Sequence, residues 1–318
     1  MLFRVHIPDG FLSAGVTTAT WAAAAVGVAS ALRAEKADSH PMPAGILGAT
    51  AAFLFAAQMI NVPIAPGVSG HLVGSALAAA LLGPWRALIA MAVVLAIQAV
   101  LFQDGGISAL GANIFDMGVA GVAVGYAVAA LTTRWMKSPR GFAIGVVGGA
   151  FAATVAASVL TGLWLGLSGL YPPGAIVQIM LVTHVPIGVL EAALTGAVIV
   201  TVLRWRPDLV RGLNPSHTVG HPAAAAIGIA GVAAAIAAFV SPFASALPDG
   251  LEYAAGLLGI AGRAHAAWPA PFAEYSLPFA ASGRVATAIA GTLGTVAVLI
   301  LAWLISRGLR AHTDVIHR

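Results

Sequence analysis

The run FAIGVVGGAFAATVAASVLTGLWL, residues 142–165, contains no charged side chain. An α-helix rises about 1.5 Å per residue, so about 20 apolar residues cross a hydrocarbon core about 30 Å thick. This run is therefore long enough to cross a membrane as one helix. Glycine and alanine recur along it, which suits close packing against neighbouring membrane helices.

The whole chain has the composition of a polytopic membrane protein. Of its 318 residues, 60% are hydrophobic and 8% are charged, and the mean hydropathy is +0.96, whereas soluble domains have about 25% charged residues. The 15 basic residues are scattered between apolar runs, so the sequence lacks the continuous basic patch of a nucleic-acid-binding protein. Because the chain has no cysteine, a metal site must use imidazole, carboxylate, amide or amine ligands.

We predict an all-α fold with about nine transmembrane helices, in a bacterial cytoplasmic membrane. The expected spans are residues 11–32, 44–61, 68–84, 87–103, 112–133, 142–165, 175–203, 222–242 and 284–306. The basic residues favour an outer N-terminus and an inner C-terminus under the positive-inside rule, because only Arg4, Arg263 and Arg284 would then lie outside. Too few residues precede the first span to form a cleaved signal, so we expect this span to stay in the mature protein.

The chain divides into two predicted parts. Residues 1–212 form a seven-span body, and residues 213–318 form a two-span appendage with a polar, proline-rich outer loop at about 243–283. The basic segment RWRPDLVRGLNPSH, residues 204–217, is expected to link them on the cytoplasmic side. The outer loop contains LPDGLEYA, residues 247–254, and WPAPFAEYSLP, residues 268–278.

Two histidines lie on the predicted outer side. His6 belongs to VHIPDGFLS, and His71 belongs to GVSGHLVG. Two converging imidazoles suit a divalent Ni, Co, Cu or Zn ion, although a lone membrane histidine can also be a hydrogen-bonded packing residue. Residues 7–10 indicate a turn that folds the terminus back toward the bundle, and Asp9 is predicted to cap the first helix.

Further polar residues lie where lipid makes them costly. His184 and Glu191 are seven residues apart, on one helix face, and could support the metal site, relay protons or fix helix packing. Asp104, Asn113 and Asp116 flank a glycine-rich turn that we place on the outer side. We expect this turn and the loop with Ser69 and Gly70 to close over the site.

Several enzyme classes are excluded because the sequence lacks their motifs. The sequence has no GxxxxGK[ST] phosphate loop, no HExxH zinc motif and no GxSxG nucleophile elbow. A metallo-hydrolase would also need a base beside the histidines to activate water, and the sequence offers none. These absences disfavour an intramembrane hydrolase, and we expect a chain without catalytic residues or a resident cofactor.

Four ordered blocks resemble the CbiM/NikM family of substrate-binding components of energy-coupling-factor (ECF) cobalt and nickel importers. The blocks are HIPDGFLS, PGVSGHLVG followed by LLGPW, QAVLFQDGGISALGANIFDMG, and HVPIGVLEAALTG, within residues 5–212. LPDGLEYA resembles the PDGLE signature of the NikN-type accessory subunit, so the chain resembles an M–N fusion. The resemblance implies Ni(II) or Co(II) as the transported substrate, with nickel slightly favoured, and a separate transmembrane coupling (T) subunit and two cytoplasmic ATPases as partners, besides membrane lipid.

The resemblance also implies a roughly square-planar metal site. Its ligands would be a terminal amine, the backbone nitrogen and imidazole of His6, and the imidazole of His71. This sequence departs from the family in having Met1 to Arg4 ahead of Val5. We expect translation to begin at Val5, read as an initiator Met from an alternative start codon, so that its amine becomes a ligand. The alternative function is a secondary metal/proton antiporter that uses Glu191 and His184.

Overall fold

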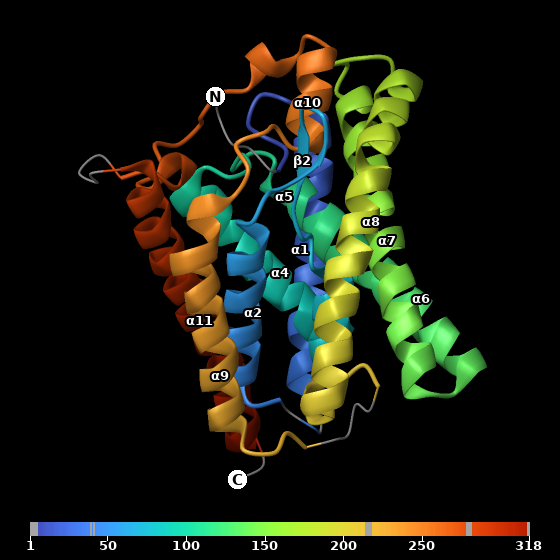
Figure 1. The fold of residues 1–318 in the computed structure, drawn as a ribbon, viewed down its shortest axis with the longest axis vertical. Coiled ribbons are helices and arrows are strands. Elements are labelled where there is room, and N and C mark those ends of the chain that lie inside the picture. Colours follow the sequence, from blue (N-terminus) through green and yellow to red (C-terminus); the bar gives the residue numbers. More distant parts are fainter. Residues whose placement is uncertain (1–5, 39, 41, 214–217, 278–281, 317–318) are drawn as a thin grey trace.

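The computed structural model describes residues 6–38, 40, 42–213, 218–277 and 282–316. Long helices form a bundle, and short elements gather at one end of it, around α10 and β2 in Figure 1. The helices are α1 (Ala14–Ala37), α2 (Ala44–Gln58), α3 (Ser75–Leu82), α4 (Pro84–Ile97), α5 (Leu110–Asn113), α6 (Gly121–Met136), α7 (Pro139–Leu167), α8 (Pro173–Trp205), α9 (Pro222–Ala235), α10 (Gly250–Leu257) and α11 (Gly283–Ile316). Two antiparallel strands, β1 (Val62–Ala65) and β2 (Val68–Gly70), make a hairpin.

Seven helical runs among the described residues are long and apolar enough to cross a membrane. They are Ala14–Ala37, Pro84–Phe102, Leu110–Met136, Pro139–Leu167, Pro173–Trp205, Pro222–Phe243 and Gly283–Leu309. The apolar helix α2 is shorter, at 15 residues. These eight helices correspond to eight of the nine predicted spans, and the protein is an all-α, multi-pass membrane protein.

The prediction of a continuous span at residues 68–84 is wrong. This segment is strand β2, an irregular loop and the eight-residue helix α3. Gly74 has a φ of +82° and ends the loop, and Gly83, with a φ of +78°, separates α3 from α4. Most of α3 is buried, and irregular backbone is tolerated at membrane depth where protein surrounds it.

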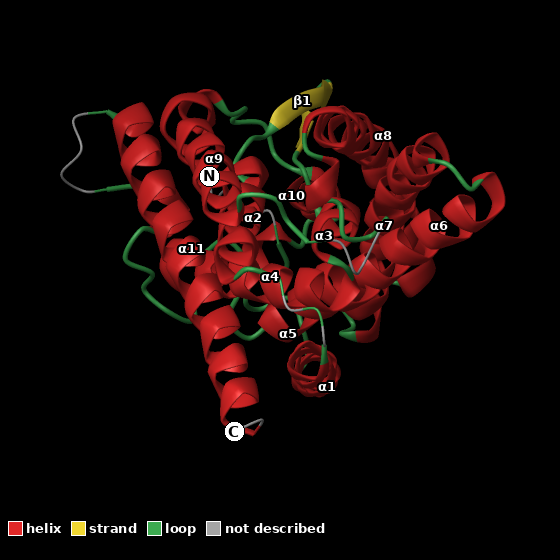
Figure 2. Ribbon diagram, turned by 90° about the horizontal axis from the view of Figure 1, so that it is seen from below, coloured by secondary structure: helices red, strands yellow, loops and turns green. Residues whose placement is uncertain are grey.

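Helix α2 lies at the centre of one half of the bundle. Helices α4, α9 and α11 pack around it, and Figure 2 shows α9 and α11 on one side and α6, α7 and α8 on the other. A Cβ atom on Gly48 of α2 would lie 2.8 Å from the Leu299 carbonyl oxygen of α11. The backbones of these two helices therefore approach closely, and the two predicted parts of the chain share one core.

Helices α6, α7 and α8 form the other half. They are successive in sequence and pack in order, α6 on α7 and α7 on α8. A Cβ atom on Gly149 of α7 would lie 2.6 Å from the Gly125 carbonyl oxygen of α6, so small residues again allow close approach. Helix α10 packs on α8 at the end of the bundle where the short elements gather.

Candidate metal centre

The N-terminal segment is held inside the bundle by Asn113 of α5 and by the loop that precedes α5. The Ile7 amide donates to Asn113 Oδ1 at 3.0 Å, and Asn113 Nδ2 donates back to the Ile7 carbonyl at 3.2 Å. The Gly106 amide also donates to this carbonyl, at 2.9 Å. Gly105 has a φ of +91°, and a Cβ atom there would lie 2.9 Å from His6 Cβ. The glycine pair therefore lets the loop lie directly against His6.

Asp104 orients the His6 ring. Their Oδ1 and Nδ1 atoms are 3.2 Å apart, and Tyr275 donates its hydroxyl to Asp104 Oδ2 at 3.1 Å. Burial and the Asp104 charge raise the pKa of Tyr275 well above its usual range, so this hydroxyl stays a donor. A carboxylate accepts, so His6 Nδ1 is the donor in this contact, and Nε2 is the ring nitrogen that remains to bind a metal. His6 Nε2 is buried, and it has no hydrogen-bond partner among the residues that the structure describes.

His71 follows strand β2 and is 7% exposed. Its Nδ1 lies 3.0 Å from the Leu72 carbonyl oxygen. A carbonyl can only accept, so the neutral His71 ring also has its lone pair on Nε2. Glu191 of α8 fixes the next residues, because its carboxylate accepts from the amides of Val73 and Gly74 at 2.6 and 2.8 Å.

His6 and His71 line one buried cavity of about 60 Å³. Their ring centroids are 6.2 Å apart and the rings are steeply inclined to each other, at 65°. Imidazole nitrogens bind divalent transition metals at about 2.0–2.1 Å, so two rings on one ion have centroids roughly 4.5–6.5 Å apart. The observed separation is within the range that a shared metal ion requires.

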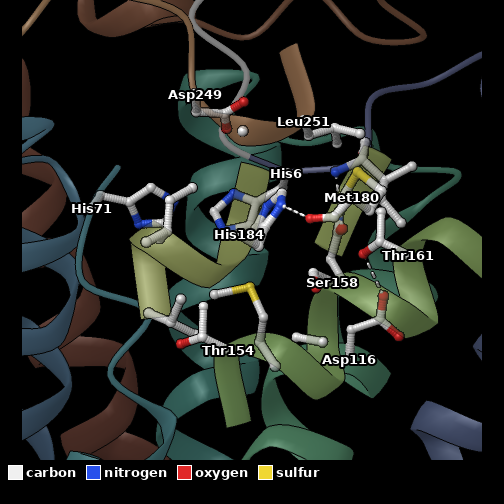
Figure 3. A pocket seen from close by; sticks show the side chains of 17 residues that line it. His6, His71, Asp116, Thr154, Ser158, Thr161, Met180, His184, Asp249 and Leu251 are labelled. Atoms are coloured by element: carbon white, nitrogen blue, oxygen red, sulfur yellow. Dashed lines mark hydrogen bonds between the residues drawn. The ribbon is translucent and has the colours of Figure 1, made fainter. Parts of the chain in front are cut away.

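His184 is the third imidazole at this cavity. Figure 3 shows it beside His6 and His71, with Asp249 at one end and Asp116 and Thr154 at the other. His184 Nδ1 lies 2.9 Å from the Met180 carbonyl oxygen, so its lone pair is also on Nε2. Asp116 lines the cavity as well, but its two carboxylate oxygens accept from Thr161 and Trp164, residues of α7, at 2.9 and 2.7 Å.

The LPDGLE segment covers the cavity. Ser69 donates its amide to the Pro248 carbonyl at 2.8 Å and its hydroxyl to the Leu247 carbonyl at 2.7 Å. Asp249 caps α10 by accepting from the Glu252 amide at 2.6 Å, and burial raises the pKa of its carboxyl well above the usual range. Asp249 and Gly250 line the cavity, and Gly250 lies directly against the His184 ring. The loop before His71 and the PDGLE segment therefore meet above the site.

The predicted site residues fall into two groups in the structure. His6, His71, Asn113 and His184 line the cavity. The others touch its walls from outside: Ser69, Gly70, Asp104 and Glu191. Val5 lies outside the described residues. Among the residues that the structure describes, no three His, Asp or Glu side chains are grouped to hold a metal ion.

The prediction that Asp9 caps the first helix is wrong. Ser13 caps α1. Asp9 Oδ1 instead accepts from the Ser108 amide and hydroxyl, at 2.7 and 2.6 Å, and its Oδ2 accepts from the Ala267 amide at 3.2 Å. Its side chain thus ties the N-terminal turn to the loop after α4 and to the outer loop of the second part. The turn itself is present, with Gly10 at a φ of +88°.

Sequence reasoning missed the cavity walls supplied by α7, α8 and the outer loop. The missed lining residues include Thr154, Ser158, Thr161, Met180, Asp249 and Leu251. The signal for Asp249 was present in the LPDGLE motif, which was assigned to the appendage without a role. The α7 and α8 residues are ordinary small or apolar helix residues, and they have no such signal.

Comparison with known proteins identifies related membrane transporters. The family model "Cobalt uptake substrate-specific transmembrane region" (CbiM) matches residues 6–209, and the PDGLE domain matches residues 223–311. The fused nickel transport protein NikMN of Rhodobacter capsulatus is 31% identical over 97% of this chain and 99% of its own length. The cobalt transport protein CbiM of Sorangium cellulosum is 32% identical over 65% of this chain and 96% of its own length.

A solved structure supports the same assignment. The crystal structure of a truncated transition metal transporter shares 32% sequence identity with this chain and superposes with a TM-score of 0.55. The match covers 63% of this chain and 98% of that one. The chain belongs to the CbiM family of cobalt uptake substrate-specific transmembrane proteins and continues into a PDGLE domain.

Proposed function

We propose that this chain is the substrate-binding component of an ATP-driven, ECF-type importer for Ni(II) or Co(II). It binds the ion from outside, with the N-terminus outside and the C-terminus inside. A separate transmembrane coupling subunit and two cytoplasmic ATPases supply the energy. The names of the relatives support nickel and cobalt as substrates, and the relative that spans both parts of this chain favours nickel.

One observation supports this proposal most directly. His6 and His71 share a buried cavity, and each ring has a partner at Nδ1 that leaves the Nε2 lone pair for a metal. Within the described part of the chain, the buried His6 Nε2 has no hydrogen-bond partner, and a bound cation would satisfy it. Nitrogen ligands without thiolate suit Ni(II), Co(II) or Cu(II) and disfavour Mg(II), Ca(II) and Mn(II).

The terminal-amine chelate is a second form of the same site. A backbone nitrogen and the imidazole of one histidine can share a metal only through Nδ1, because Nε2 is too far along the ring. His6 Nδ1 contacts Asp104 in the structure, so this chelate would require the ring to leave Asp104. We propose it for a chain that begins at residue 5, where Val5 is replaced by the initiator Met and supplies the amine.

Metal titration of the purified full-length chain tests the proposal. We expect His6→Ala and His71→Ala each to weaken Ni(II) and Co(II) binding by at least about a hundredfold, measured by calorimetry and native mass spectrometry. The native mass also gives the N-terminus of the chain. His221→Ala is the matched control, because His221 is exposed and lies at the start of α9, away from the cavity. Unchanged affinity in both cavity variants would refute the site.

Uptake in cells tests the energy source. We expect radioactive nickel uptake to stop when the two ATPase subunits are removed and to persist when the proton gradient is collapsed while ATP is maintained. The opposite pattern would support the antiporter that uses Glu191 and His184. Competition by excess cobalt measures the preference between the two ions.

A further inference from the structure

A second cavity lies against the metal centre, and its described lining residues include no histidine. It has a volume of about 130 Å³, and Asp104 is one of its lining residues. Asp104 also contacts His6, which lines the first cavity. The other polar lining residues that matter here are Asn61, Ser241, Ser245, Glu274 and Tyr275. We call this space the oxygen cavity, because each of these lining side chains carries an oxygen atom.

The oxygen cavity contains an amide oxygen that needs a partner. Asn61 is 8% exposed, and its buried Oδ1 atom has no hydrogen-bond partner among the described residues. Two carboxylates, those of Asp104 and Glu274, line the same space, and no lysine or arginine is among its described lining residues. Carboxylate, amide and hydroxyl oxygens are the ligands that hard or hydrated divalent cations prefer. A cation would satisfy Asn61 Oδ1 and balance the carboxylates together.

The fold of the outer loop positions Glu274 at the oxygen cavity. Glu274 and Tyr275 have φ values of 57° and 54°, a region that residues other than glycine rarely adopt. The Tyr275 ring stacks on Phe102 with centroids 4.5 Å apart, and the Phe272 amide donates to the Leu101 carbonyl at 2.9 Å. These contacts fix the turn against Leu101 and Phe102, at the end of the helical run Pro84–Phe102. Glu274, in this turn, lines the cavity from the PDGLE part of the chain.

We propose that the oxygen cavity is an outer binding site for a hydrated divalent cation, from which the ion passes by Asp104 to the histidines. Each water in the liquid occupies about 30 Å³. The oxygen cavity, at about 130 Å³, therefore has the volume of about four waters, and the histidine cavity, at about 60 Å³, that of about two. The ion would lose water stepwise, first to oxygen ligands and then to imidazoles. The transfer role rests on the proposed function, whereas the cation site itself does not.

Manganese binding tests the site separately from nickel binding. Mn(II) prefers oxygen ligands, and electron paramagnetic resonance follows its binding directly. In the His71→Ala background we expect saturable Mn(II) binding that weakens at least about tenfold on adding Glu274→Gln or Asn61→Leu. Glu252→Gln is the matched control, because it neutralises a carboxylate of the same outer segment that does not line this cavity. No Mn(II) binding, or binding that Glu274→Gln leaves unchanged, would overturn the site.

The rate of nickel loading tests the transfer. An ion bound on the way in must also pass the same site on the way out, so losing the site slows both directions equally. We expect Glu274→Gln in the otherwise unchanged chain to slow Ni(II) association and dissociation about tenfold while equilibrium affinity changes less than about twofold. Unchanged rates would refute the transfer role. Loss of Ni(II) binding in His71→Ala bears only on the proposed function, and Mn(II) binding in that variant bears only on the oxygen cavity.

Discussion

Glu191 supports the metal centre without lining its cavity. Its two carboxylate oxygens accept from successive backbone amides, those of Val73 and Gly74, which follow His71 in the chain. Hydrogen bonds to a charged acceptor are short and strong, and an unpaired buried amide costs about 1–3 kcal/mol. The carboxylate therefore connects α8 to the loop that positions His71.

We predict that Glu191→Gln weakens Ni(II) binding about tenfold and lowers the melting temperature. The neutral amide keeps one acceptor oxygen, so one of the two loop amides loses its partner and the His71 ring becomes less well positioned. Calorimetric titration and thermal unfolding measure the two effects. Equal affinity in the variant and the parent would show that the loop holds His71 without Glu191.

Glu35→Gln is the matched control for this change. Glu35 is also buried, at 7% exposure, and its Oε2 lies 2.6 Å from Arg86 Nε, in a contact between α1 and the start of α4. We expect this variant to lose stability and to keep its nickel affinity. Loss of affinity in both variants would mean that unfolding, not the position of His71, explains the effect of Glu191→Gln.

The sequence singles out residues whose chemistry is unusual in a membrane, and their role as metal ligands stays a prediction. His6 and His71 stand out because imidazoles are rare in apolar runs, and the structure places them at one cavity. The contact of Glu191 could not be predicted, since its partners are backbone amides and every residue except proline has one. Asp9 resembled a helix cap because it precedes α1, but its partners come from residues 108 and 267.

Among the elements, the segment from Val62 to Leu82 shows where apolar composition misleads. Hydropathy reports only how apolar a segment is. It does not distinguish a helix that spans the membrane from a hairpin, loop and short helix that other helices enclose. Gly67, Gly74 and Gly83 all have positive φ values, which a continuous helix cannot include. The eight remaining spans were predictable because each is a long apolar run without such breaks.

Helix α10 offers a test of how the outer segment sits on α8. A Cβ atom on Gly250 would lie 2.6 Å from His184 Cε1 and 2.8 Å from Ile187 Cδ1, whereas one on Gly256 would meet nothing within 4 Å. We predict that Gly250→Ala lifts α10 from α8 and speeds amide hydrogen exchange in residues 249–257 by at least about tenfold. Gly256→Ala should leave exchange equal or slower, because alanine favours a helix by about 1 kcal/mol over glycine. Equal exchange in both variants would contradict this close approach.

At the scale of the whole molecule, the second part of the chain is built into the first. The sequence suggested an appendage, because residues 204–217 are polar and basic and separate two groups of apolar runs. In the structure α9 and α11 pack on α2, and the outer loop reaches Ser69, Asp9 and Asp104. Pairing between distant helices depends on side-chain shape across their contact, and the order of apolar runs along a chain does not specify it.

A shared core predicts that the two parts unfold together. Gly294 of α11 lies against Phe55 of α2 and Phe102, and a Cβ atom on it would come within 2.6 Å of Phe102 Cζ. We expect Gly294→Leu to lower the melting temperature by several degrees, since overpacking costs about 1–3 kcal/mol. Hydrogen exchange should show α4 and α11 losing protection at the same temperature. Gly308→Leu, at a position with no atom within 4 Å of an added Cβ, should not change the melting temperature. If α11 loses protection in Gly294→Leu while α4 keeps it, the PDGLE part is an independent unit, and its cover over the histidines could open without disturbing the body.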